Sequence, residues 1–538
     1  MSLSVVYTRA NIGIDAPLVT IEVHLSNGMP AFQLVGLPET SVKESRDRVR
    51  SALINAGFEF PSKRITVNMA PADLPKGGGR FDLAIAIGII AASEELPDTA
   101  LEPYEFVGEL ALSGELRSIQ GALPMAFAAR NSNRQLILPL SNANEAALVT
   151  KTSVLCASTL FDVYLHLTGK QALPVAQTQS ENYPPPNYGD LNEIIDQQHA
   201  KRALEIAASG AHNILFFGPA GTGKSMLASR LLSIMPDLSE EDALVVSSIR
   251  SVVGEPIDAN NWRQRPLRQP HHSSSAAAIV GGGTYPKPGE ITLAHKGVLF
   301  LDELPEFGRH VLDVMREPLE TGEINLSRAA HKVCYPADFQ LVAAMNPSPT
   351  GDIDDKRANP DQILRYLNRI SGPLLDRIDL QVNVPRVNLE KTLSRSVAPN
   401  DESDTGNDNR QDASEHGRGS NHEAISKQSA HSSSESSKIV KRRVETAHAL
   451  QLARQGVLNS ALSNQQINIH CSLTPSNQRF ITQAIDALGL SMRAYHRTLK
   501  VARTVADLQG AEHIEQAHIA EALSFRNFDR LLHQLTNS

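Results

Sequence analysis

The sequence contains few cysteines and lacks a long hydrophobic run. Its three cysteines, Cys156, Cys334 and Cys471, lie far apart in the 538 residues. This spacing excludes a disulfide framework and a zinc knuckle. No stretch approaches the roughly 20 apolar residues that a bilayer-spanning helix needs. The first residues also lack a basic segment followed by an apolar one, so we expect no signal peptide and no membrane contact. We therefore predict a cytoplasmic protein.

The sequence also has no excess of positive charge. Its formal net charge is −8, which gives no overall attraction to nucleic acid. The charge is uneven, however, because residues 401–437 contain eight acidic and three basic side chains and carry −5 by themselves. The rest of the chain therefore carries only −3. This balance does not exclude a local basic surface or a basic pore.

Composition and periodicity predict a multidomain α/β protein, and the length fits about three domains. Residues 1–168 mix strand-like and helical runs, and the proline-rich residues 169–189 predict a stiff linker. Alternating strands and helices predict an αβα P-loop core over residues 190–396. Residues 397–437 are rich in Ser, Asn and Asp, so we expect an acidic disordered insert. Residues 438–538 have a helical pattern, in four or so helices.

The most informative motif is Gly-Pro-Ala-Gly-Thr-Gly-Lys-Ser at residues 218–225, a complete Walker A loop. An apolar run at 213–217 precedes it, and helical periodicity over 226–235 follows it. This order predicts a strand, a phosphate-binding loop and a helix N-terminus. Lys224 would place its charge on the outer phosphates, and the Ser225 hydroxyl would bind Mg²⁺. We therefore expect ATP and Mg²⁺ as cofactors.

Two further strands end in polar residues. The apolar run 297–301 ends at Asp302 and Glu303, which has the form of a Walker B motif. Asp302 would hold hydrated Mg²⁺, and Glu303 would orient or deprotonate the attacking water. The run 339–345 ends at Asn346, which could hold that water; a turn-initiating Asn before proline is the alternative. The predicted nucleotide-binding residues are Gly218, Pro219, Ala220, Gly221, Thr222, Gly223, Lys224, Ser225 and Asp302, and the predicted Mg²⁺ ligands among them are Ser225 and Asp302.

Two arginine segments resemble parts of AAA+ motors. The run Ser-Gly-Pro-Leu-Leu-Asp-Arg-Ile-Asp around Arg377 is similar to the arginine-finger segment of AAA+ helicases and magnesium-chelatase motors. The resemblance implies that Arg377 acts on the nucleotide of a neighbouring subunit. The alternative is a surface ion pair of Arg377 with Asp376 or Asp379. The helical segment around Arg493 resembles a sensor-2 helix, and Arg497, one turn further on, is an alternative to Arg493. The predicted catalytic residues are Glu303, Asn346, Arg377 and Arg493.

From end to end, the chain resembles the magnesium-chelatase-like AAA+ family known as YifB or ComM. The matching segments are residues 36–45, 199–208, 268–273, 371–379 and 501–508. The resemblance implies a hexameric ATPase ring with a C-terminal helical lid. For the ComM type it also implies a DNA helicase that drives branch migration while transforming DNA is integrated by homologous recombination. The implied partners are further copies of the chain, single-stranded or branched DNA, and recombination proteins.

Two segments contain candidate DNA contacts by this resemblance. Residues 323–333 read as a hairpin with a basic tip, similar to the pre-sensor-1 hairpin of related ring helicases. Contacts from its basic side chains to phosphates would give a sequence-independent grip, and solvated surface charges are the alternative. Residues 263–287 resemble the helix-2 insert of these motors, a flexible loop that faces the pore. The candidate DNA-binding residues are Arg328, His331, Lys332 and Lys287.

The N-terminal segment resembles the α/β proteolytic domain of Lon, of the S5 type. Lon-type proteolysis needs a serine nucleophile that a lysine activates. This chain has Arg80 where that motif places the serine and Leu123 where it places the lysine. We therefore predict a non-proteolytic scaffold. For the whole chain, the alternative functions are a magnesium-chelatase-like metal-insertion motor subunit and an ATP-switched scaffold.

Overall fold

The computed structural model describes residues 2–36, 44–150, 154–177, 188–257, 260, 262–283, 286–327, 332–352, 359–386 and 435–537. Arg328, His331, part of the predicted linker and nearly all of the predicted 397–437 insert lie outside these ranges. Within them, no helix combines the length and the apolar character needed to cross a membrane.

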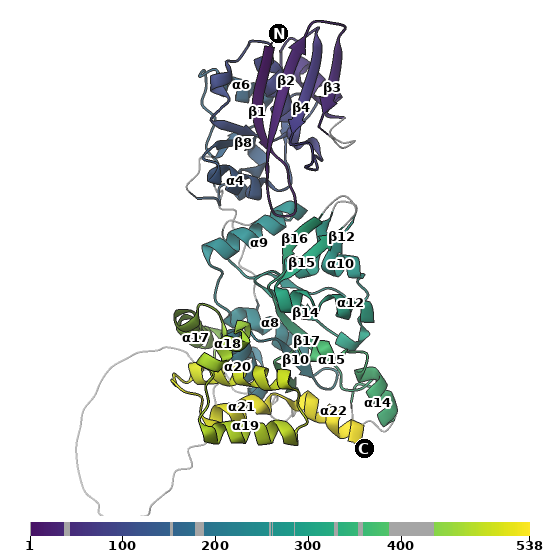
Figure 1. The fold of residues 1–538 in the computed structure, drawn as a ribbon, viewed down its shortest axis with the longest axis vertical. Helices are drawn as coiled ribbons and strands as arrows, with labels where there is room; N and C mark the ends of the chain where they lie inside the picture. The colour runs from purple at the N-terminus through teal and green to yellow at the C-terminus, as the bar shows by residue number, and fades with distance from the viewer. Residues whose placement is uncertain are drawn as a thin grey trace, which may run out of the picture. The chain divides into compact units, whose positions relative to one another are not determined.

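The chain forms two compact units, each made of several chain segments (Figure 1). The first unit contains Met1–Asn187, Pro236–Ala343 and Asn368–Ile378. The second unit contains Tyr188–Met235, Ala344–Leu367 and Asp379–Ser538.

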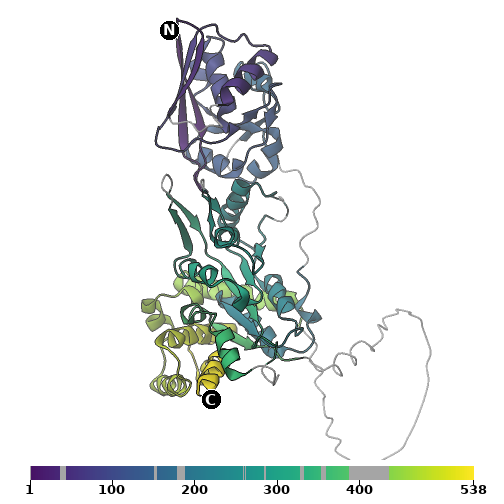
Figure 2. The same ribbon diagram turned by 90° about the vertical axis from the view of Figure 1, so that its right-hand side faces the viewer.

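The N-terminal part of the first unit contains a seven-stranded mixed sheet in the order β3-β4-β2-β1-β5-β8-β9. Its strands are β1 (Ser2–Arg9), β2 (Leu18–Ser26), β3 (Ala31–Val35), β4 (Arg64–Ala70), β5 (Tyr104–Phe106), β8 (Gln135–Pro139) and β9 (Val154–Ala157). Strand β2 pairs antiparallel with β1 and β4, and the other neighbours pair in parallel. The accompanying helices are α2 (Ser45–Asn55), α3 (Asp82–Ala92), α4 (Ala122–Asn131), α5 (Ala143–Ala146) and α6 (Leu160–Leu167). Figure 2 shows the helices of this part gathered beside the purple strands.

The centre of this part is helix α3, all eleven residues of which are buried. It packs against β1 and β2. Alternate residues of β2 are buried, as expected for a strand that places one face against a helix and the other toward solvent. The predicted mixture of strands and buried helix is therefore an α/β layer structure.

Helix α9 (Glu240–Val253) follows the Walker A segment in the chain but packs against the N-terminal part of the first unit. It contacts α4, and its Leu244 lies in the apolar cluster that the residues of α4, β8 and β9 form. The Gly121 N–H donates to the Ser251 carbonyl oxygen (3.0 Å), and the Ser251 hydroxyl donates to the Glu145 carboxylate (2.6 Å). Burial raises the pKa of Glu145. Apolar packing and a buried carboxylate therefore join the N-terminal part to α9.

Three parallel strands of the first unit lead to the Walker B residues. They are β11 (Leu267–Arg268), β14 (Val298–Leu301) and β17 (Gln340–Met345), and β14 pairs with both of the others. Every residue of β14 and β17 is buried, as expected for parallel strands covered on both faces. Strand β17 begins in the first unit, and its last two residues belong to the second.

A two-stranded hairpin, β15 (Glu323–Ser327) and β16 (Lys332–Pro336), follows the short helices α12 (Arg309–Val314) and α13 (Pro318–Thr321). The antiparallel pair confirms the predicted hairpin, and its tip lies outside the described residues. The segment predicted as a flexible insert contains α10 (Ala276–Val280) and a pair of two-residue strands, β12 (Gly281–Gly282) and β13 (Lys287–Pro288). The region between β11 and β14 is therefore more structured than the sequence predicts.

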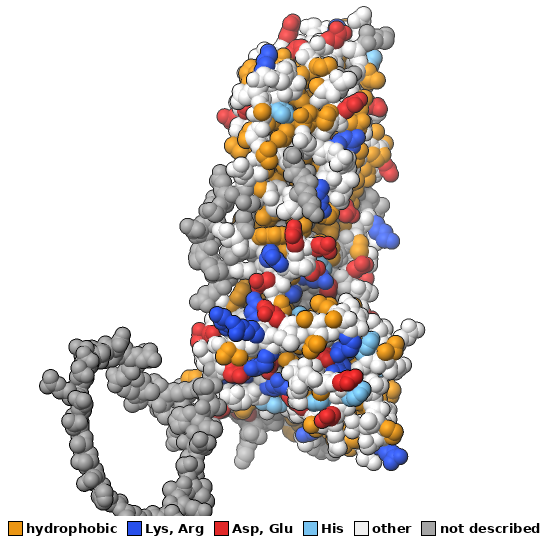
Figure 3. Space-filling model, turned by 90° about the vertical axis from the view of Figure 1, so that its left-hand side faces the viewer, with side chains coloured by type: hydrophobic (Ala, Val, Ile, Leu, Met, Phe, Trp, Pro, Cys, Tyr) orange, Lys and Arg blue, Asp and Glu red, His pale blue; other side chains and the backbone are white. Residues whose placement is uncertain are grey.

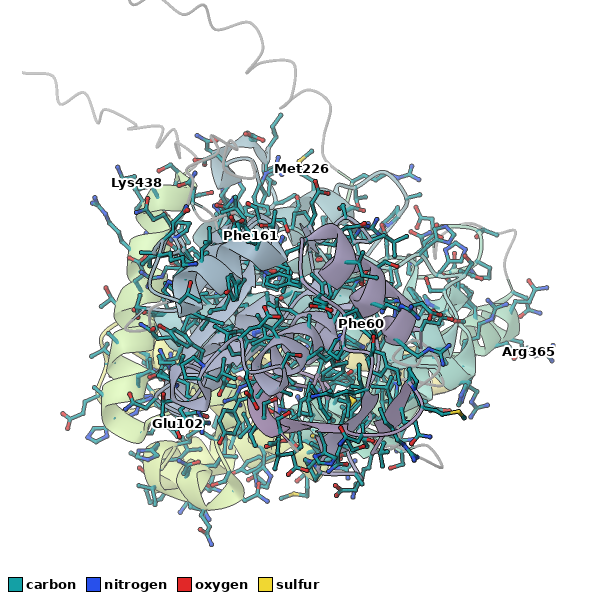
Figure 4. The ribbon with its side chains drawn as sticks, turned by 90° about the horizontal axis from the view of Figure 1, so that it is seen from above. Phe60, Glu102, Phe161, Met226, Arg365 and Lys438 are labelled. Carbon is teal, nitrogen blue, oxygen red and sulfur yellow. The ribbon has the colours of Figure 1, made fainter. Side chains whose placement is uncertain are left out.

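In the second unit, β10 (Ile214–Phe217) pairs in parallel with β18 (Leu380–Asn383). Helices α7 (Gln198–Gly210) and α8 (Lys224–Ile234) pack together, and both contact α17 (Ser437–Gln455). Helix α8 buries Leu227 and Leu231, whereas its Met226 is exposed (Figure 4). Lys438, at the start of α17, is also exposed.

The C-terminal segment is helical as predicted, but residues 435–537 contain six α-helices rather than four or so. They are α17, α18 (Asn464–His470), α19 (Pro475–Ala487), α20 (Met492–Leu508), α21 (Gln516–Ser524) and α22 (Asn527–Asn537). The undercount has a physical reason. Phe525, directly after α21, and Phe528, in α22, are both fully buried, so the apolar pattern continues from one helix into the next.

Candidate nucleotide-binding site

The Walker A residues form the turn between β10 and α8 in the second unit. Gly221 and Gly223 have φ values of +77° and +88°, a region of backbone space that favours glycine. Helix α8 begins at Lys224, so the loop ends at a helix N-terminus. This arrangement binds phosphate in P-loop proteins because backbone amides and the helix dipole favour an anion there.

The Lys224 side chain lies against the loop, and the residue is only 8% exposed. Its ammonium donates to the carbonyl oxygens of Gly218 (2.8 Å) and Pro219 (2.9 Å) and to Oδ1 of Asn346 (3.1 Å). Asn346 directly follows β17, and the Gly218 N–H donates to the Met345 carbonyl oxygen (3.3 Å). The second unit therefore brings together the predicted Walker A lysine and the predicted sensor-1 asparagine.

The loop residues fit a polyphosphate. The three acceptors of Lys224 named above are neutral oxygens, and a charged phosphate oxygen would form a stronger hydrogen bond with the ammonium. The Thr222 hydroxyl donates to the Pro219 carbonyl oxygen (3.1 Å), which closes the loop on itself. Ser225 lies exposed in the first turn of α8, where its hydroxyl is accessible to a metal ion. These residues fit ATP, and oxygen ligands of this kind suit Mg²⁺.

The Walker B carboxylates lie in the first unit, directly after β14. The Glu303 N–H donates to Oδ1 of Asp302 (2.9 Å). Glu303 has a φ of +53°, which is uncommon for a residue with a side chain and is typical of functional sites. Its carboxylate is 3.2 Å from Nδ1 of His272.

His272 is a residue near the site that the sequence interpretation assigned no role. It follows β11, and β11 pairs in parallel with β14, which ends just before Glu303. The carboxyl ends of neighbouring parallel strands meet at one sheet edge, so this pairing explains how His272 reaches the Glu303 carboxylate. In the sequence, His271 and His272 follow a short strand-like run. Their proximity to Glu303 could be found only by knowing that this strand pairs with β14.

Arg377 follows α15 (Gly372–Leu375) and is buried, with its side chain only 7% exposed. Its guanidinium donates to the Pro373 carbonyl oxygen (2.5 Å) and forms an ion pair with Glu320, at the end of α13. The structure therefore gives Arg377 an ion-pair partner, Glu320, that the sequence did not suggest. Asp379 is engaged elsewhere, in the second unit, and Glu320 lies too far along the chain for local spacing to reveal it.

Arg497 pairs with Asp379 through Nη1 (2.6 Å). Asp379 also accepts the Asn213 N–H (3.0 Å), and Nδ1 of His212 lies 3.5 Å from it. Burial alone would raise the pKa of Asp379, but Arg497 and His212 outweigh burial and hold it well below its usual range. Arg497 is therefore committed to a buried ion pair. Arg493, exposed in the first turn of α20, remains the predicted sensor-2 residue.

The arginines of the predicted insert make internal contacts. Arg265 donates to the carbonyl oxygens of Pro236 (2.7 Å) and Lys296 (2.6 Å). Arg268 pairs with Glu255 (2.9 Å) and Glu290 (2.8 Å). Both guanidinium groups therefore have acceptors within the first unit. The candidate Lys287, in β13, is exposed, as is Lys332 at the start of β16.

A strand, a Walker A loop and a helix, together with a Walker B strand end and a helical C-terminal region, define a P-loop core of the AAA+ type. Models of the magnesium chelatase family match three parts of the chain. Magnesium chelatase, subunit ChlI, matches residues 190–392; subunit ChlI of Mg-chelatase matches residues 21–142; and the ChlI C-terminal region matches residues 434–526.

Relatives match over the full length. The chain is 52% identical to Competence protein ComM of Haemophilus influenzae, over 100% of both chains. It is 49% identical to YifB of Salmonella typhimurium, over 99% of this chain and 98% of that protein. The magnesium-chelatase 38 kDa subunit of Rhodobacter capsulatus is 28% identical over 30% of this chain and 51% of its own length. The chain belongs to the magnesium-chelatase-like AAA+ family that includes ComM and YifB.

Proposed function

We propose that the protein is an ATP-driven motor that acts on DNA in homologous recombination, as a helicase or branch-migration translocase that helps to integrate transforming DNA. The observation that carries this proposal is the full-length match, at 52% identity, to a protein named for competence. The motor is proposed to be a hexameric ring of identical subunits, in which an arginine finger can act on the nucleotide of a neighbouring subunit.

In the proposed nucleotide site, Lys224 exchanges its neutral oxygen partners for phosphate oxygens of ATP. Asn346 already lies 3.1 Å from the Lys224 ammonium, so it would be next to the terminal phosphate when Lys224 binds it. Ser225 and Asp302 are the proposed Mg²⁺ ligands; the bound ion would neutralise phosphate charge.

Glu303 is the proposed residue that orients or deprotonates the attacking water. Its contact with Nδ1 of His272 at 3.2 Å holds the carboxylate at the end of β14. Arg377 is the proposed arginine finger and Arg493 the proposed sensor 2. Both would stabilise the charge that develops on the transferred phosphoryl group.

The proposed DNA contacts are exposed lysines of the first unit. Lys332 lies on the described part of the β15–β16 hairpin, and Lys287 lies on β13. Arg328 and His331, beyond the described residues, belong to the same prediction. On the face shown in Figure 3, positive and negative side chains are interspersed over the described surface, so this face offers no single basic tract. The proposal places the DNA interaction on the hairpin because Lys332 is exposed there and Arg328 and His331 belong to the same segment.

The N-terminal part is proposed to be a Lon-like scaffold without peptidase activity. Leu123 is fully buried in the α4 cluster, and an apolar side chain there cannot activate a nucleophile. Arg80 stands where the nucleophile would be, and a guanidinium is not nucleophilic at neutral pH.

Steady-state ATP hydrolysis with and without DNA tests the proposal. We expect single-stranded and forked DNA to stimulate hydrolysis strongly at low salt and less at moderate salt, because phosphate contacts release counterions. Lys224→Ala should lose hydrolysis under all conditions and thereby exclude a contaminating ATPase. Hydrolysis that depends on Lys224 but not on DNA would contradict the DNA motor and favour a metal-insertion motor subunit or an ATP-switched scaffold.

A further inference from the structure

The ion pair between Arg377 and Glu320 joins two segments of the first unit that are 57 residues apart in the chain. The two side chains differ in exposure: that of Arg377 is 7% exposed and that of Glu320 is 57% exposed. A buried guanidinium keeps its charge, so it needs an acceptor wherever it lies. Glu320 provides that acceptor from the surface, where its carboxylate can return to water without a large desolvation penalty.

Glu320 is rigidly connected to the β15–β16 hairpin. The Thr321 hydroxyl donates to the Glu317 carbonyl oxygen (3.0 Å) and accepts the Glu323 N–H (3.2 Å). Gly322 separates α13 from β15 with a φ of +70°, and the Ala337 N–H donates to its carbonyl oxygen (2.7 Å). These contacts link the helix of Glu320 to both strands at the base of the hairpin. A displacement of the hairpin would therefore displace Glu320.

We propose that Glu320 is a positioning residue that holds Arg377 in the resting chain, and that DNA binding to the β15–β16 hairpin releases it. This inference rests on the proposed function, because it assigns the hairpin to DNA and Arg377 to the nucleotide of the neighbouring subunit. While Glu320 holds the guanidinium, Arg377 cannot pair with phosphate. When the hairpin moves, α13 withdraws the carboxylate, and the negatively charged phosphates of the neighbour's nucleotide become the stronger partner.

The contact is suited to switching. The Glu320 carboxylate can return to water at little cost, so another anion can replace it as the partner of the guanidinium. The backbone acceptor of Arg377, the Pro373 carbonyl oxygen, lies in α15, four residues before the arginine, and would move with it. The Glu320 carboxylate, by contrast, comes from outside the segment of Arg377, so it can be withdrawn from the arginine.

ATP hydrolysis by the full-length Glu320→Gln protein, without DNA, tests this inference. We expect kcat to rise about threefold to tenfold, because the amide holds Arg377 more weakly than the carboxylate does. KM for ATP should not change, since Glu320 has no proposed contact with the subunit's own nucleotide. DNA should then stimulate the variant less than the wild type. Glu320→Asp, which keeps the charge, should return kcat toward the wild-type value.

Glu323→Gln is the matched control. It removes the same charge three residues further on, at the start of β15, where the Cys334 thiol, 3.4 Å away, is the donor to the carboxylate. We expect it to hydrolyse ATP as the wild type does. In the double variant Glu320→Gln with Arg377→Ala, hydrolysis should match Arg377→Ala alone, because Glu320 acts through Arg377.

A folded Glu320→Gln protein with unchanged or lower kcat would overturn the inference. An equal rise of kcat in the Arg377→Ala background would also overturn it, since the effect would not pass through the arginine. If Arg377→Ala hydrolyses ATP at the wild-type rate, the finger assignment fails and the inference fails with it. Absence of DNA stimulation in the wild type alone would contradict the proposed function, and the DNA-free comparison would still decide whether Glu320 restrains Arg377.

Discussion

Arg377 in the first unit and Arg497 in the second are both paired with a carboxylate, but the two carboxylates lie in different surroundings. The Asp379 side chain is 4% exposed, whereas that of Glu320 is 57% exposed. If the pairs separate, the Asp379 carboxylate is left uncompensated away from water, whereas the Glu320 carboxylate is solvated as soon as it is released. The same chemical pair therefore serves as a structural element in one unit and as an exchangeable contact in the other.

Arg377→Ala tests whether the Arg377 pair has a role in ATP hydrolysis, and it has the largest expected effect. Loss of an arginine finger lowers kcat by about a thousandfold or more, so hydrolysis should nearly disappear while ATP still binds. The midpoint of chemical denaturation should change little, because the Glu320 carboxylate is already exposed. Hydrolysis rates and equilibrium ATP binding of the variant measure both expectations.

Mixed rings test whether Arg377 acts between subunits. Arg377→Ala subunits keep Lys224, and Lys224→Ala subunits keep Arg377, so a mixture should partly recover hydrolysis that neither variant has alone. If mixtures remain inactive over all ratios although the subunits assemble, an action on the neighbour's nucleotide is wrong.

Asp379→Ala tests whether the Asp379–Arg497 pair stabilises the fold. Removal of one partner from a buried ion pair lowers the free energy of unfolding by about 3–5 kcal/mol. In the other pair, Arg377→Ala leaves only the exposed Glu320 carboxylate, so it should lower the free energy of unfolding much less. Denaturation of both variants and the wild type under the same conditions measures this difference. Equal destabilisation by the two substitutions would contradict the assigned roles.

The contribution of Asp379 to the free energy of unfolding should also depend on pH. Because its folded-state pKa is lower than the unfolded-state value, its contribution is fully present above the unfolded pKa of about 3.9 and is lost as the pH falls toward the folded pKa. The stability difference between the wild type and Asp379→Ala should thus be constant between about pH 5 and 8 and should shrink below about pH 4. A difference that already declines near neutral pH would show that another group is responsible.

Lys332→Ala has the smallest expected effect and tests whether DNA acts on the first unit. DNA affinity should fall by about fivefold at low salt, and the slope of log affinity against log salt should decrease by about one. Stability should not change, because Lys332 is exposed. Lys438→Ala, an exposed lysine of α17 in the second unit, is the control. Equal losses of DNA affinity in both variants would remove the hairpin from the interaction.

Residues of local motifs could be predicted from the sequence. The Walker A loop, the Walker B carboxylates and Asn346 each follow a buried apolar strand, and β10, β14 and β17 confirm those strands. The hairpin was predicted from its resemblance to the pre-sensor-1 hairpin of related ring helicases, and the pairing of β15 with β16 confirms its two strands. Local spacing determines which residues share a strand end, and this is sufficient for these positions.

The partners of the two arginines could not be predicted. Arg493 and Arg497 are one turn apart on α20, so helical spacing treats them as equivalent; Asp379, distant in sequence, distinguishes them. Glu320 and Arg377 meet only because α13 and the segment after α15 pack in the same unit. The structured region between β11 and β14 was also missed, because Arg265 and Arg268 read as surface charges until their acceptors are known.

The attachment of α9 to the N-terminal part has a practical consequence for anyone who shortens the chain. Leu244, Ile257 and Trp262 come from the ATPase segment, yet they pack in or against the apolar cluster of α4, β8 and β9. A protein that began after residue 187 would expose these side chains and the carbonyl oxygen of Ser251 to water. We expect such a fragment to self-associate through this exposed apolar surface. Any ring that it formed would need to be distinguished from aggregates.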